Sequence, residues 1–198
     1  MTKERIIQKA TDLFSLHGIK SVSMDDLASS LGISKRTIYM IFKNKEDILK
    51  NCILCTQQDI SQNINRITAQ SENIISVFLQ IIDHYKFTQL PTARFWDDID
   101  KYYPEVYQSI LREIERSNIY LKQLLEEGIK NEYFRQNLNF DEVFSVCLII
   151  SNIYSSGILL SRKDLVFNIM INILRGISTP KGIEIIDRYV ESLSYSNN

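Results

Sequence analysis

Very little in this chain would interrupt a helix. Its 198 residues include only 6 glycines and 3 prolines, and two of the prolines, Pro91 and Pro104, lie close together. Alternation of apolar and polar residues between turn signals, which is typical of strands, is hard to find. Because 44% of the residues are hydrophobic, the chain has enough apolar side chains to build a core. We therefore predict an all-α fold.

The first fifty residues predict three helices. The first carries apolar residues at three- and four-residue spacing and ends at Gly18. The second begins after Ser23, which opens an S-x-x-D capping signal, and ends at Gly32. The third is capped by Ser34 and covers residues 35–42. Two short helices joined by a tight turn, with basic residues at the start of the second, are typical of a helix-turn-helix, whose second helix enters the major groove of DNA.

Further helical segments continue almost to the end of the chain. A fourth helix, residues 45–67, is long enough to link one domain to the next. Six more helices are expected at residues 71–87, 93–101, 104–131, 141–160, 162–175 and 180–193. We therefore predict about nine or ten helices: a three-helix DNA-binding domain over residues 1–50 and a second helical domain over residues 51–198.

Charge is distributed unevenly along the chain. The net charge is −1, but residues 1–50 hold nine Lys and Arg against six Asp and Glu, whereas the rest hold 14 against 18. Five of the nine cations fall between Lys35 and Lys50, where a local positive field can attract phosphate groups. An ordinary solvated helix face would carry similar charges, so the charge pattern favours DNA binding without establishing it.

The residues of the helix-turn-helix divide into three groups by the chemistry of their side chains. The apolar group forms a small core that fixes the angle between the second and third helices; it consists of Leu13, Phe14, Val22, Leu27, Leu31, Ile38 and Phe42. The second group can bind the DNA backbone through hydroxyl groups, ammonium groups or helix N-termini; it consists of Ser23, Ser34, Tyr39, Lys43 and Lys45. The third group opens the third helix, the part of a recognition helix that faces base edges, and its predicted base readers are Lys35, Arg36 and Thr37.

One segment resembles the DNA-binding module of the tetracycline-repressor (TetR) family. It is 10-ATDLFSLHGIKSVSMDDLASSLGISKRTIYMIFKNKEDIL-49, with Ala-x-x-Leu-Phe, Leu-Gly-Ile-Ser, Thr-Ile-Tyr and Lys-x-Lys-Glu in that order. The resemblance implies that Tyr39 and Lys45 contact phosphates and that Lys35, Arg36 and Thr37 approach bases. Beyond this segment, the chain resembles the family in length and helical layout alone.

The segment 144–160 is apolar on nearly all sides of a helix, so it must be covered on more than one side. With the helix that follows, it can cover its own core and also a second copy of the chain in a two-fold contact. A core helix of a monomer is the alternative, although one recognition helix reaches a single half-site. The resemblance also implies a homodimer on a palindromic double-stranded operator. The predicted interface residues are Phe144, Cys147, Ile150, Tyr154, Val166, Ile169 and Ile173.

Many aromatic residues lie among the helices of the second domain, and such a set can line an apolar pocket with a few polar groups. The predicted pocket residues are His84, Phe87, Trp96, Tyr107 and Asn152. From this set and the resemblance we hypothesise that a small apolar or amphipathic effector releases the protein, a repressor, from DNA. Packing is the alternative role for each of these residues. The alternative to this hypothesis is a DNA-binding regulator that is controlled by a protein partner, or that is an activator, without a small-molecule ligand.

An enzyme is the rival from another class. The histidines are His17, expected on the buried side of the first helix, and His84, and neither has a carboxylate pair, phosphate loop or metal-ligand spacing nearby. Cys52 and Cys55 form a C-x-x-C, but no second ligand pair completes a zinc site. We therefore predict no enzyme activity, no metal and no cofactor, and treat the cysteines as helix residues whose redox role the sequence leaves open.

The N-terminus predicts a cytoplasmic protein, because it enters an amphipathic helix with no apolar signal region. The most apolar segment, residues 144–160, contains several serines and an asparagine and is shorter than the ~18 residues that a membrane span needs. We expect a buried helix there and no contact with a membrane.

Overall fold

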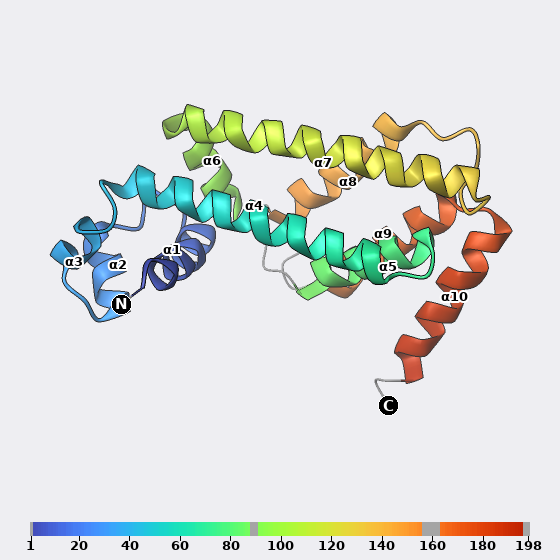
Figure 1. The fold of residues 1–198 in the computed structure, drawn as a ribbon, viewed down its shortest axis with the longest axis horizontal. Coiled ribbons are helices and arrows are strands. Elements are labelled where there is room, and N and C mark those ends of the chain that lie inside the picture. Colours follow the sequence, from blue (N-terminus) through green and yellow to red (C-terminus); the bar gives the residue numbers. More distant parts are fainter. Residues whose placement is uncertain (1, 88–90, 156–162, 196–198) are drawn as a thin grey trace. The chain divides into compact units, whose positions relative to one another are not determined.

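The computed structural model describes residues 2–87, 91–155 and 163–195, and all ten of the helices found there are α-helices (Figure 1). They are α1 (Lys3–His17), α2 (Met24–Leu31), α3 (Lys35–Tyr39), α4 (Lys45–Gln70), α5 (Ile74–Phe87), α6 (Ala93–Tyr102), α7 (Pro104–Lys130), α8 (Phe140–Ser155), α9 (Lys163–Ile177) and α10 (Pro180–Tyr195). Strand-like pairing in the described parts amounts to one isolated bridge between Phe134 and Ser178. The predicted all-α fold is confirmed. No helix in these parts has the length and apolar character needed to cross a membrane.

Two compact units make up the chain. The first unit comprises residues 1–62, 90–114 and 155–157, and the second comprises residues 63–89, 115–154 and 158–198. Thus α6 and the beginning of α7 belong to the same unit as α1, α2 and α3. The predicted division at residue 50 does not coincide with the boundaries of these packing units, and as a division by function it stays a prediction.

The first unit is built around a continuous apolar core. All seven residues of the predicted small core contribute to it, and Phe14, Ile38 and Phe42 are almost completely buried. The core also takes in side chains that the sequence pattern of the first three helices did not predict: Ile48, Leu49 and Cys52 from α4, Phe95 and Ile99 from α6, and Val106 and Ile110 from α7. The helix-turn-helix is therefore supported by apolar packing well beyond residue 50.

Polar contacts join α6 to the segment between α1 and α2. The carboxylate of Asp98, which is buried, accepts a hydrogen bond of 2.7 Å from the backbone N–H of Lys20. The backbone N–H of Thr92 donates to the carbonyl of Ser15 at 3.0 Å.

His17 is exposed, so the expectation that it lies on the buried side of α1 was wrong. It falls on the last turn of α1, after the apolar stripe has ended at Phe14.

In the second unit, α5 packs against α9 and α10, and α9 also packs against α10 (Figure 1). Its core includes Ile75 and Leu79 from α5, Ile171 from α9 and Ile186 from α10. The ring of Phe134, in the segment after α7, is buried beside Gly128 and meets the ring of Phe78 edge to face, with 5.5 Å between centroids. This unit thus has an apolar core of its own.

Candidate nucleic-acid interface

Helix α3 presents its polar residues outward because one apolar side chain anchors it. Ile38 is fully buried, whereas Lys35 and Arg36 are exposed and Thr37 is partly exposed. The helix ends at Tyr39 and not at Phe42 as predicted, and residues 40 and 41 continue it as a turn. In this turn the backbone N–H groups of Ile41 and Phe42 both donate to the carbonyl of Ile38.

Caps hold the first residues of α2 and α3 in place. The Ser34 hydroxyl accepts a hydrogen bond from the backbone N–H of Thr37 at 3.1 Å and shares another of 2.8 Å with the Thr37 hydroxyl. Ser23 and Asp26 form a reciprocal capping box at the start of α2. Both caps were predicted from the sequence. They occupy the hydroxyl groups within the protein, so a phosphate contact by either serine remains a prediction.

The other predicted backbone-binding residues differ in accessibility. Tyr39 and Lys43 are exposed. Lys45 is half-buried, with its ammonium 5.8 Å from the centroid of the Phe14 ring. Burial lowers the pKa of Lys45, and the nearby charge of Lys20 lowers it further, while Asp98 and Asp26 oppose the shift. Lys43 is therefore the more accessible cation for a phosphate.

Two exposed residues beside the predicted readers had no role assigned from the sequence. Met40 is 79% exposed, directly after α3. Asp25, in the first turn of α2, binds Lys35 through an ion pair with 2.9 Å between Nζ and Oδ2. The outward position of Met40 could be predicted from helical spacing. The Asp25 contact could not, because ten residues and a turn separate the partners.

The predicted dimer residues lie on helices that carry accessible apolar surface. Phe144, Cys147 and Ile150 on α8, and Val166, Ile169 and Ile173 on α9, are partly buried in the single chain. The Tyr154 side chain lies outside the described residues. The most exposed apolar residues of α8 are ones that the prediction did not select: Val146, Leu148, Ile149 and Ile153. We call these four residues the α8 apolar face.

The predicted effector residues fall in separate parts of the chain. Trp96 and Tyr107 pack against the core of the first unit, and the Trp96 ring meets Phe95 edge to face at 5.3 Å. His84 belongs to the second unit and is exposed. The side chains of Phe87 and Asn152 lie outside the described residues. An effector pocket built from these five residues stays a prediction.

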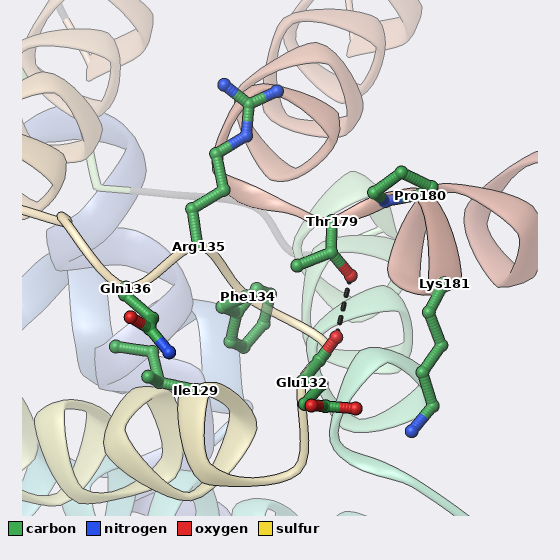
Figure 2. A pocket seen from close by; sticks show the side chains of 8 residues that line it. All are labelled: Ile129, Glu132, Phe134, Arg135, Gln136, Thr179, Pro180 and Lys181. Carbon is green, nitrogen blue, oxygen red and sulfur yellow. Dashed lines mark hydrogen bonds between the residues drawn. The ribbon is translucent and has the colours of Figure 1, made fainter.

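Two surface hollows among the described residues have other linings. One hollow of about 370 Å³ lies where the segment after α7 meets the start of α10, and the hydroxyl of Thr179, one of its lining residues, bonds to the protein itself (Figure 2). Thr179 donates to the carbonyl of Glu132 at 2.7 Å, and Arg135 donates to the carbonyl of Ser178 at 3.0 Å. A second hollow, about 610 Å³, lies between α4 and α7 and is lined by Lys50, Ile53, Leu54, Gln57, Glu105, Val106, Gln108, Ser109 and Arg112. Neither hollow is lined by a predicted effector residue.

The cysteines of α4 lie at the apolar core of the first unit, Cys52 within it and Cys55 packed against it. Cys52 is buried, and its thiol donates to the carbonyl of Ile7 at 3.5 Å. Burial raises the pKa of Cys52 to about 12, which keeps the thiol protonated and unreactive at neutral pH. Among the described residues, no group of three or more His, Cys, Asp or Glu is placed to hold a metal ion.

Comparison with known proteins agrees with the helix-turn-helix and extends it. A family model described as "Bacterial regulatory proteins, tetR family" matches residues 6–52. A transcriptional regulator of Bacillus subtilis, YhgD, is 28% identical over 134 residues, which cover 65% of this chain and 70% of that protein. The biofilm-operon negative transcriptional regulator IcaR of Staphylococcus epidermidis is 26% identical over 132 residues, covering 63% of this chain and 62% of that protein.

A solved structure shares most of the fold. A transcriptional regulator from Saccharomonospora viridis, solved in complex with choline, superposes with a TM-score of 0.75 at 17% identity and covers 89% of this chain and 97% of its own. At this identity the likeness concerns the fold. The layout of helices beyond residue 52 is therefore shared with a regulator although the sequences have diverged.

Proposed function

We propose that this chain is a DNA-binding transcriptional regulator of the TetR family, a homodimeric, cytoplasmic repressor that reads a palindromic operator with α3. The observation that carries the proposal is the exposure of Lys35 and Arg36 on a short helix that is capped by Ser34 and anchored by the buried Ile38. A rigid helix with cations at its N-terminal end has the form of a major-groove reader.

Different residues serve affinity and sequence preference in this proposal. Arg36 and Lys35 bind base edges, where an arginine can donate two hydrogen bonds to guanine O6 and N7. Thr37 meets a thymine through its methyl group. Lys43 and Tyr39 bind the backbone and position the helix, because phosphate contacts carry no sequence information. Lys45 adds positive charge from a half-buried site, and Ser23 and Ser34 lie at helix starts that can approach phosphates.

A second copy of the chain supplies the second reading helix. The α8 apolar face and the neighbouring α9 residues leave apolar area exposed in one copy, which a two-fold contact would bury. Repression is supported by the negative regulation that the staphylococcal relative is named for. Release by a small apolar or amphipathic ligand is the mode of control that we propose, and the choline complex shows a small ligand on a protein of this fold.

Two substitutions separate base reading from backbone binding. Arg36→Ala should reduce discrimination at one operator position by about 1–3 kcal/mol while leaving non-specific binding nearly intact. Lys43→Ala should weaken binding to all duplexes alike and reduce the slope of log K against log salt by about 1. Fluorescence anisotropy on matched and mismatched duplexes measures both effects. Identical behaviour of the two variants would contradict the division of roles.

A further inference from the structure

Asp25 and Lys35 join the first turns of the two helices of the helix-turn-helix. The ammonium of Lys35 lies 2.9 Å from Oδ2 of Asp25, and their side chains remain 45% and 73% exposed. The pKa of Lys35 is raised, chiefly by its hydrogen bond to Asp25. A charged donor and a charged acceptor therefore stand side by side at the end of α3 that is proposed to read bases.

This ion pair is not needed to build the fold. The cap of α2 is made by the neighbouring Asp26, which accepts from the backbone N–H and the hydroxyl of Ser23. The packing of α2 on α3 rests on buried apolar residues such as Leu27 and Ile38. Exposed ion pairs add little to stability. The carboxylate of Asp25 lies on the surface that is proposed to bind DNA, where a negative charge repels the phosphates. A role in recognition would explain why an acidic residue stands at this position.

The spacing of the two charges matches the edge of one base pair. In the major groove, a G·C pair presents the O6 acceptor of guanine beside the N4 amino donor of cytosine. These two atoms are joined by a Watson–Crick hydrogen bond, so they lie about 2.9 Å apart. The Lys35 ammonium and the Asp25 carboxylate, at 2.9 Å, offer a donor and an acceptor at the same separation.

We propose that Asp25 is a specificity-determining residue that, together with Lys35, reads one G·C base pair in each half-site. The ammonium donates to guanine O6 and N7, and the carboxylate accepts from cytosine N4. The inference rests on the proposed function, because it requires α3 to lie in the major groove.

The pair reads the order of acceptor and donor across the base pair. A reversed C·G pair sets the cytosine amino group against the ammonium and guanine O6 against the carboxylate, so both contacts become repulsive. A T·A pair keeps the order, but thymine lacks the second acceptor that guanine N7 provides and carries a methyl group instead. The expected preference is therefore G·C first, T·A next, and the two reversed pairs last.

Selection from a randomised duplex library, followed by anisotropy on the selected operator, tests this reading. The wild-type dimer should select G·C at one position in each half-site. Asp25→Asn should reduce the preference for G·C over C·G there by about tenfold or more and strengthen binding to unrelated duplexes, since one repelling charge is gone. Lys35→Met should relax the preference at the same position.

Asp12→Asn is the control, because it makes an equal charge change on α1. It should strengthen binding to all duplexes without relaxing that preference.

The outcomes distinguish this inference from the function on which it rests. If the wild type selects an operator but Asp25→Asn keeps the same preference, or relaxes a different position from Lys35→Met, Asp25 is not a reader. If the wild type selects no sequence, the proposed function itself fails. Asp25→Ser serves as a second variant, and circular dichroism melting verifies that each variant is folded.

Discussion

Gly18 ends α1 with a backbone conformation that other residues rarely adopt. Its φ is 83° and its ψ is 158°, and its N–H donates to the carbonyl of Phe14 at 2.9 Å. A Cβ at this position would lie 2.6 Å from Cγ of Arg94 and 3.0 Å from Oδ2 of Asp98. Both the backbone angles and the approach of α6 therefore require glycine at the point where the chain turns toward α2.

Gly18→Ala should destabilise the protein by about 1–3 kcal/mol, because alanine is strained at these angles and its methyl group displaces Arg94 or Asp98. Gly176→Ala is the matched control: Gly176 lies in α9, and a Cβ there meets nothing within 4 Å. The control should be neutral or stabilising by up to about 1 kcal/mol. Urea unfolding followed by circular dichroism measures both. Equal effects would show that Gly18 is not a special position.

Some features of single residues could be predicted from the sequence and others could not. The caps at Ser23 and Ser34 and the burial of Phe14, Ile38 and Phe42 could be predicted, because each depends on residues a few positions away. The partial burial of Lys45 depends on its contact with Phe14 and could not be predicted. The position of His17 was predicted wrongly because helical spacing was extended one turn too far.

At the scale of a helix, α2 depends on its capping box. The Ser23 hydroxyl accepts from the backbone N–H of Asp26 at 3.0 Å, and the Asp26 carboxylate accepts from the hydroxyl and the backbone N–H of Ser23. The pKa of Asp26 is lowered by these bonds, the one from the Ser23 hydroxyl first. A carboxylate whose pKa is lowered on folding stabilises the fold above its ordinary pKa, and this stabilisation is lost as pH falls through the folded value.

Ser23→Ala should raise the pKa of Asp26 toward its ordinary value and cost about 0.5–2 kcal/mol at neutral pH, the usual effect of losing a serine cap. The difference in unfolding free energy from the wild type should shrink as pH falls below about 4. Carboxyl NMR titration and urea unfolding across pH test the two parts. A difference that is constant with pH would show that the Asp26 half of the box contributes nothing.

Most helix boundaries lie within a few residues of those predicted from the sequence, but the end of α3 was predicted wrongly. Helical spacing of Ile38 and Phe42 predicted a helix to residue 42, but α3 ends at Tyr39 and a turn carries Phe42 into the core. A turn and a helix can bury the same two residues. Spacing alone therefore did not distinguish them.

At the scale of the whole molecule, the sequence suggested a function for each part of the chain, but it did not indicate which helices pack together into one unit. The apolar residues of α6 and α7 complete the core of the first unit, yet they lie more than forty residues beyond the third helix. Periodicity shows that a helix has a buried face but not which helix covers it. The same limit explains why Val146, Leu148, Ile149 and Ile153 were not selected as interface residues, although their apolar character was evident.

The proposed dimer makes a prediction about the α8 apolar face. Ile149 is 56% exposed in the single chain, so Ile149→Glu should leave the folded chain intact but place a charge in the interface, where burial of an unpaired carboxylate is costly. Sedimentation at micromolar concentration should show a dimer for the wild type and a monomer for the variant. Gln123→Glu, at an exposed site of α7, should remain dimeric. A wild-type monomer would refute the dimer.

Selection of DNA by the wild-type chain tests the central claim most directly. Duplexes enriched from a randomised library should contain two inverted half-sites whose centres are separated by whole helical turns of DNA, about 10–10.5 base pairs each. Each selected duplex should bind an even number of chains, measured by sedimentation of the complex. Enrichment of no sequence, or of a single half-site bound by one chain, would contradict the account of this protein as a dimeric reader of a palindromic operator.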